Sequence, residues 1–232
     1  MTPLQLVLLP GMDGTGEMFE PLLRAIAATN ATCKIQILRY PCDRPLNYEA
    51  LIEFAASQLP NTPSVLIAES FSGPIAIELA ARFPNTIERV VLSTSFVRNP
   101  LSWLALMAPM IDFLPIAHAP IWLMQQQLFN RQATPELNLA LVRAIDSVSP
   151  AVMRARLKAI FNVDASKSLK RLTQPLLYLQ ADADRLVPER CAQEVKTALA
   201  STTIRRLAGP HCLLQTAPDQ AWQVIQAWLQ EG

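Results

Sequence analysis

Short apolar runs alternate along this chain with segments of helical periodicity, and this alternation restricts the possible folds strongly. The first run, Leu4–Leu9, stops at a Pro-Gly pair, as is typical of a buried strand. Further strands are predicted at 34–39, 64–68, 87–93, 176–180 and 203–207. Helices are predicted at 18–28, 48–59, 74–83, 188–199 and 219–230. Alternating strands and helices form βαβ units, so we expect an α/β fold: a mostly parallel sheet with helices on both faces.

One long segment interrupts this alternation. No convincing strand lies between Asn99 and Arg171, and the segment is rich in bulky apolar side chains. It is divided by six prolines: Pro100, Pro109, Pro115, Pro120, Pro135 and Pro150. We interpret residues 99–171 as a helical insertion that covers the carboxyl edge of a core formed by 1–98 and 172–232. Ordinary core helices are the alternative.

Charge and composition exclude several classes of protein. Lysine and arginine total 20 and aspartate and glutamate 19, for a net charge of +1, which is too little to favour a nucleic-acid partner. Hydrophobic residues make up 51% of the chain, so a disordered chain is excluded. No apolar stretch reaches the roughly 18 residues of a membrane span. The first residues, 1–11, lack the basic segment of a secretion signal, so we do not expect them to be a signal peptide.

The cysteines and histidines predict neither a metal nor a disulfide framework. Cysteines occur at 33, 42, 191 and 212, without the spacing of a metal finger. With His118 and His211 as the two histidines, imidazole ligands are scarce. We expect no metal and a reduced, cytoplasmic protein, and the oligomeric state stays open.

A serine stands between the third predicted strand and the helix after it. A sharp strand-to-helix turn strains the backbone of the residue at its apex, so the residues two before and two after must be small. Around Ser70 these residues are Ala68 and Ser72, and Gly73 follows. Ser70 is therefore a candidate nucleophile, although an ordinary turn with an incidental serine is the alternative. Ser72 is a weaker candidate, because Pro74 stands at its second following position.

The loop after the first strand, Leu-Pro-Gly-Met-Asp-Gly-Thr-Gly, holds three of the six glycines. Acyl transfer requires backbone N–H donors that face the developing oxyanion. After a nucleophile elbow one donor belongs to the next residue, here Phe71. Gly11 would let the loop approach the substrate, which makes Met12 the second candidate donor. A structural turn is the alternative, and no phosphate-binding motif is present.

Candidate acid and base residues follow the last two predicted strands. Asp184 and Asp182 both come soon after a strand, where a carboxylate can orient a histidine, and we favour Asp184. The alternative is a loop carboxylate that caps the next helix. His211 follows the final strand, at the edge where open α/β sheets bind ligands. We expect His118 to be structural or exposed and Cys212 to be a buried neighbour.

Serine, acid and histidine thus occur in the order of an α/β-hydrolase triad. With the Leu-Pro-Gly-Met-Asp-Gly loop, Ala-Glu-Ser-Phe-Ser-Gly, Asp-Arg-Leu-Val-Pro and Gly-Pro-His, the chain resembles a compact member of the α/β-hydrolase superfamily. In position, the insertion resembles that family's cap domain. The first loop resembles those of thioesterase-like and plastid acyl-ester synthase-like members.

This resemblance implies a serine hydrolase that needs no cofactor and acts on a small-molecule carboxyl ester or thioester with an apolar acyl group. It implies that Ser70 attacks, His211 transfers the proton, Asp184 holds the imidazole, and the amides of Met12 and Phe71 bind the oxyanion. Acyl transfer, C–C bond hydrolysis, a lyase reaction and ligand binding with little turnover are the alternatives.

Overall fold

The computed structural model describes residues 3–29, 31–100, 111 and 120–231. Its centre is a six-stranded, fully parallel sheet in the order β2-β1-β3-β4-β5-β6. The strands are β1 (Leu4–Leu9), β2 (Cys33–Ile37), β3 (Ser64–Glu69), β4 (Ile87–Ser93), β5 (Leu176–Ala181) and β6 (Thr203–Leu207). Each overlaps a strand predicted from the sequence, so the predicted parallel α/β fold is confirmed.

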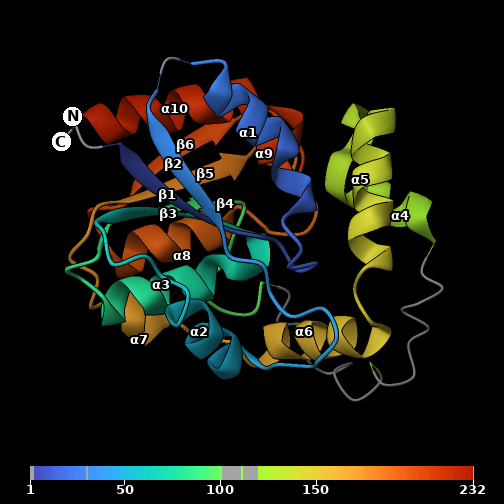
Figure 1. The fold of residues 1–232 in the computed structure, drawn as a ribbon, viewed down its shortest axis with the longest axis horizontal. Helices are drawn as coiled ribbons and strands as arrows, with labels where there is room; N and C mark the ends of the chain where they lie inside the picture. Colours follow the sequence, from blue (N-terminus) through green and yellow to red (C-terminus); the bar gives the residue numbers. More distant parts are fainter. Residues whose placement is uncertain (1–2, 30, 101–110, 112–119, 232) are drawn as a thin grey trace.

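Helices cover both faces of the sheet (Figure 1). One face carries α1 (Glu20–Ala27), α9 (Leu213–Thr216) and α10 (Pro218–Gln230), and the other carries α2 (Tyr48–Ala56), α3 (Gly73–Arg82), α7 (Ser166–Leu169) and α8 (Arg190–Ala198). Two cores result because strand side chains alternate between the faces. In β1, Leu6 and Leu8 join the core of α1 and α10, whereas Val7 and Leu9 join that of α2 and α3.

The described part of 99–171 contains α4 (Ile121–Phe129), α5 (Pro135–Asp146), α6 (Pro150–Asn162) and α7, with a 3-10 turn at Asn130–Gln132. Two of the prolines that divide the sequence here, Pro135 and Pro150, are the first residues of helices. Thr134 and Ser149 accept hydrogen bonds from backbone N–H groups of the first turns of α5 and α6, directly before Pro135 and Pro150. Figure 1 shows α4 and α5 beside the layered core. His118 lies outside the described residues, and the division into core and insertion stays a prediction.

The side chains that join α4 and α5 to the core form one apolar cluster: Met18, Phe129, Leu137, Leu141, Ala144 and Cys212. Of these, Met18 lies in the 3-10 turn Glu17–Phe19 and Cys212 follows β6. The cluster thus fastens the described insertion helices next to the loops that leave the carboxyl ends of the strands.

Strand register brings the candidate residues to one edge. Leu9 pairs with Ala68, and Glu69 pairs with Ser93, so β1, β3 and β4 end at nearly the same level. Ala181 pairs with Leu207, so β5 and β6 also end together. Because all six strands run parallel, the loops that follow β1, β3, β5 and β6 leave from the same edge.

The part of the chain that the structure describes supports neither a membrane-spanning helix nor a metal-binding cluster. No helix in the described ranges combines the length and the apolar character that a membrane crossing requires. Within the same ranges, no three His, Cys, Asp or Glu side chains are grouped so that they could hold a metal ion.

Candidate active site

Ser70 occupies a strained position directly after β3. Its φ of 49° lies in the left-handed region, which costs free energy for a residue with a side chain. The small neighbours Ala68 and Ser72 are both fully buried, as the predicted elbow requires. A 3-10 turn over Ser70–Ser72 then leads into α3. The backbone therefore presents the Ser70 hydroxyl above the sheet edge.

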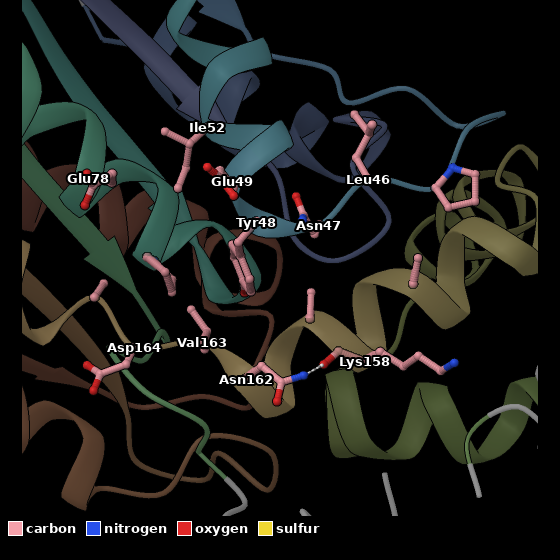
Figure 2. Close-up of a pocket in the computed structure, with 15 residues that line it drawn as sticks. Leu46, Asn47, Tyr48, Glu49, Ile52, Glu78, Lys158, Asn162, Val163 and Asp164 are labelled. Atoms are coloured by element: carbon pink, nitrogen blue, oxygen red, sulfur yellow. Dashed lines mark hydrogen bonds between the residues drawn. The ribbon is translucent and has the colours of Figure 1, made fainter. Parts of the chain in front are cut away.

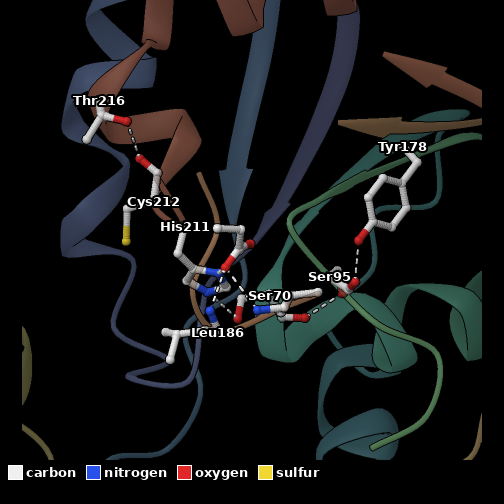
Figure 3. Close-up of polar contacts among 9 residues, drawn as sticks. Ser70, Ser95, Tyr178, Leu186, His211, Cys212 and Thr216 are labelled. Atoms are coloured by element: carbon white, nitrogen blue, oxygen red, sulfur yellow. Dashed lines mark hydrogen bonds and ion pairs between the residues drawn. The ribbon is translucent and has the colours of Figure 1, made fainter. Parts of the chain in front are cut away.

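The elbow is braced from the loop after β4. The Ser95 hydroxyl donates a hydrogen bond to the Ser70 carbonyl, and the Tyr178 hydroxyl donates one to the Ser95 carbonyl (Figure 3). Gly73 permits this approach, because a Cβ there would lie 1.9 Å from the Ser95 Oγ. The strained conformation of Ser70 is thus fixed by the loop after β4 and, through it, by a side chain of β5.

His211 links Ser70 to Asp184. Its Nε2 lies 2.9 Å from the Ser70 Oγ, and its Nδ1 lies 2.9 and 3.0 Å from the two Asp184 carboxylate oxygens. Because a carboxylate only accepts, the proton belongs on Nδ1, and Nε2 is left to accept from the Ser70 hydroxyl. The His211 and Asp184 side chains are each 5% exposed, so water competes little for this contact.

Asp184 and Asp182 have different partners. Asp184 Oδ1 also accepts from the backbone N–H groups of Leu186 and Val187, at 2.8 and 2.9 Å, which fixes the carboxylate toward His211. Asp182 is exposed and accepts from the Gly209 N–H at 2.9 Å. The structure therefore brings Asp184 to the histidine, while Asp182 tethers the loop that carries it.

Ser72 and Cys212, which the sequence analysis weighed beside Ser70, are poor nucleophiles in this structure. Ser72 is fully buried, donates to the Pro10 carbonyl and receives a hydrogen bond of 2.6 Å from the Tyr40 hydroxyl. Burial raises the pKa of the Cys212 thiol well above its ordinary value, so little thiolate forms. Cys212 is a buried neighbour of His211, as the sequence suggests.

Met12 and Phe71 both line the cavity that holds Ser70 and His211. Phe71 is supported from α2, where the Tyr48 hydroxyl donates to its carbonyl at 2.9 Å and the two rings stack with centroids 4.6 Å apart. The structure therefore brings the proposed oxyanion donors to the wall beside the serine.

Glu69 is an acid that the sequence analysis did not single out. It directly precedes Ser70, is 5% exposed, and accepts one hydrogen bond of 3.1 Å from the Gln215 amide. Its Oε1 and the Gln215 Oε1 are buried without a partner among the described residues. Burial raises the pKa of Glu69 from 4.5 to about 7, and nearby Asp13 adds to this, while His211 and Gln215 oppose it.

The cavity above Ser70 has a volume of about 260 Å³ and is predominantly apolar. The lining residues that come from α4, α5 and α6 are Met124, Leu128, Leu141, Ile145, Met153, Leu157, Ile160 and Phe161. No lysine or arginine is among the described lining residues. Such a wall suits an uncharged apolar group next to the Ser70 hydroxyl.

Sequence reasoning found the residues that stand in turn motifs and missed the side chains that support them. Ser95 and Tyr48 act through backbone carbonyls, and neither belongs to a recognisable motif. The signal available for Glu69 was its acidic side chain directly after the apolar run Val65–Ala68, where an ionised carboxyl is unfavourable.

A parallel sheet between two helical layers, with a serine elbow whose hydroxyl meets a histidine held by an acid, defines an α/β-hydrolase. Within this class, the family model described as serine aminopeptidase, S33, matches residues 46–213. The chain belongs to that family.

The sequence identity between this chain and individual relatives is low. A pimeloyl-[acyl-carrier protein] methyl ester esterase from Neisseria meningitidis is 24% identical over 199 residues, which cover 80% of this chain and 77% of that protein. The chloroplastic phytyl ester synthase 1 of Arabidopsis thaliana is 32% identical over 122 residues, covering 47% of this chain and 16% of the synthase.

Among solved structures, an enol-lactonase from Burkholderia xenovorans has a similar fold, with a TM-score of 0.79 and 17% identity. The match covers 99% of this chain and 92% of the lactonase. This likeness establishes the fold.

Proposed function

We propose that this protein is a serine hydrolase that cleaves a carboxyl ester or thioester with an apolar acyl group through an acyl-enzyme intermediate. The observation that carries the proposal is the unbroken hydrogen-bonded chain from the Ser70 hydroxyl through His211 to Asp184, at the floor of an apolar cavity. Its hydrolase family and an esterase relative agree with it.

The mechanism assigns one role to each group. The Ser70 Oγ attacks the carbonyl carbon while His211 Nε2 takes its proton, and Asp184 stabilises the resulting imidazolium. The Met12 and Phe71 N–H groups stabilise the oxyanion of the tetrahedral intermediate. As the C–O or C–S bond breaks, His211 protonates the leaving group. Water then attacks the acyl-enzyme with His211 as base, which releases the acid and regenerates Ser70.

In this proposal the segment 99–171 is a cap that binds the acyl chain. The α4, α5 and α6 side chains of the cavity wall offer dispersion contacts and no described cation. An uncharged aliphatic chain would lose water there without an unpaired charge, whereas an acyl group with a terminal carboxylate would be buried without a partner.

Acyl transfer to an alcohol is the second candidate, because the chain matches part of a protein named phytyl ester synthase. Transfer uses the same acyl-enzyme and differs only in the final acceptor. The products of one reaction, run with and without a long-chain alcohol, distinguish the two: free acid indicates hydrolysis and a new ester indicates transfer.

The test uses wild type and Ser70→Ala with p-nitrophenyl esters and a fluorophosphonate probe. We expect the wild type to be labelled and active, and the variant to lose labelling and roughly 10⁴-fold or more of kcat/KM. Labelling and turnover that persist in Ser70→Ala would exclude this nucleophile. Ligand-induced stabilisation without labelling would indicate a binding protein, and faster cleavage of aminoacyl anilides than of esters would reject the ester assignment.

A further inference from the structure

Arg156 of α6 reaches from the insertion into the loop that carries Met12. Its side chain is 1% exposed. Its Nη1 donates to the carbonyls of Met12, at 2.9 Å, and Asp13, and its Nη2 donates to the Pro41 carbonyl at 2.9 Å. One guanidinium thereby joins α6 to two separate loops of the core.

These contacts complete a series along the loop after β1. The Pro10 carbonyl is held by the Ser72 hydroxyl, and the Gly14 carbonyl by the Tyr40 N–H at 2.8 Å. The two carbonyls to which Nη1 donates lie between them. Without Arg156, the middle of the loop would lose these two contacts while its ends stayed fastened.

Burial of a charged guanidinium costs solvation free energy, which a neutral side chain with a purely structural role would avoid. No described carboxylate forms an ion pair with it. Its described partners are carbonyl dipoles, the Cys42 side chain and the ring of Tyr40, whose centroid lies 5.7 Å from the Arg156 Cζ. Burial lowers the pKa of Arg156, in keeping with a charge removed from water. Its planar fork lets it reach several carbonyls at once, which an ammonium cannot do with the same geometry.

The loop is shaped around this side chain. Gly14 has a φ of 70°, and a Cβ there would lie 2.6 Å from the Arg156 Nη1. The adjoining backbone therefore leaves space that the guanidinium fills.

Helix α6 separates two hollows. Its residues Leu157, Ile160 and Phe161 line the cavity above Ser70. Ala155, Lys158, Ala159 and Asn162 line a groove of about 590 Å³ that α6 shares with α2 and α3 (Figure 2). Arg156 thus ties a wall of the proposed acyl site to the backbone of the proposed oxyanion site.

We propose that Arg156 is a positioning residue: by fixing the two peptide units that follow Met12, it orients the residue whose N–H is assigned to the oxyanion and couples its placement to helix α6. The inference rests on the proposed function, because it assigns Met12 the role of oxyanion donor. It predicts an effect on the transition state that exceeds any effect on substrate binding.

The experiment compares wild type, Arg156→Lys and Arg156→Met, with Arg154→Met on the same helix as the control. We expect Arg156→Met to lower kcat by about 100-fold, as loss of an oxyanion donor does, with KM changed less than about threefold. A boronic acid that mimics the tetrahedral intermediate should lose affinity by a similar factor. Arg156→Lys should fall between wild type and Arg156→Met, and Arg154→Met should match wild type.

Hydrogen exchange of the peptides that cover residues 10–16 supplies a readout that needs no activity. These amides should exchange faster in both Arg156 variants than in Arg154→Met. Unchanged kcat and boronate affinity, a rise in KM alone, or unchanged exchange would overturn the inference. If Arg156→Met does not fold, Arg156→Lys decides. If the wild type neither cleaves esters nor reacts with the fluorophosphonate, the proposed function fails, while hydrogen exchange still tests the contact between Arg156 and the loop.

Discussion

Replacement of Glu69 by glutamine tests the electrostatics of the elbow through protein stability. Glu69 is 5% exposed, and its Oε1 has no hydrogen-bond partner among the described residues. A protonated carboxyl suits this position better than a carboxylate, because burial raises the pKa of Glu69 from 4.5 to about 7. Glutamine has nearly the same shape as glutamic acid and cannot ionise.

The size of the effect follows from that pKa difference. Each pKa unit corresponds to about 1.4 kcal/mol, so ionisation of Glu69 costs the folded protein about 3 kcal/mol more than the unfolded chain. Between pH 4.5 and about pH 7 the folded protein keeps the proton that the unfolded chain has released. Glu69 therefore makes the protein less stable as the pH rises through this window, and above it the loss is complete.

Urea unfolding from about pH 4.5 to pH 9 measures this contribution. The free energy of unfolding of Glu69→Gln, relative to wild type, should rise by about 3 kcal/mol across this range. Ionisable groups common to both proteins cancel in the comparison. Glu49→Gln, at an exposed carboxyl of α2, controls for the loss of one negative charge. A constant difference between Glu69→Gln and wild type, or one that falls as the pH rises, would refute the argument that Glu69 is destabilised by ionisation.

The remaining predictions concern the acid and the elbow. Asp184→Asn should lower kcat by roughly 10³- to 10⁴-fold with little change in fold, because the imidazole would lose the acceptor that selects its tautomer. Asp182→Asn should keep nearly all activity. Equal losses of kcat in the two variants would contradict the assignment of Asp184 as the acid. Gly73→Ala should destabilise the protein by about 1–3 kcal/mol in urea unfolding, since its Cβ would meet the Ser95 Oγ; unchanged stability would show that Ser95 moves freely.

The centre of the sheet could be predicted from sequence because strands there are buried on both faces. All residues of β3 and β5 are buried, and such strands appear as continuous apolar runs. The short helix α9 was not predicted, since four residues carry little periodicity. In the insertion, the sequence predicts only that prolines separate short helical segments. The structure adds that Pro135 and Pro150 follow capping side chains and so begin α5 and α6.

The convergence of Ser70, Asp184 and His211 could be predicted because each follows the carboxyl end of a parallel strand. Chain order and sheet direction then suffice to place them at one edge. The supporting contacts have no such rule. Ser95 reaches Ser70 across 25 positions and Arg156 reaches Met12 across 144, in each case through a backbone carbonyl. Every residue has a backbone carbonyl, so the sequence does not indicate which carbonyl a distant side chain will bind.

The same pattern explains how a site on loops can be rigid. Donors from elsewhere in the chain hold the carbonyls beside the proposed functional groups: Ser95 holds that of Ser70, Tyr48 that of Phe71, and Arg156 that of Met12. Each contact fixes a peptide unit without touching the space where a substrate would sit. Preorganised dipoles stabilise a transition state most when they need not reorient during the reaction. Loss of such a donor should therefore reduce kcat more than it weakens substrate binding, which separates these residues from those that line the acyl cavity.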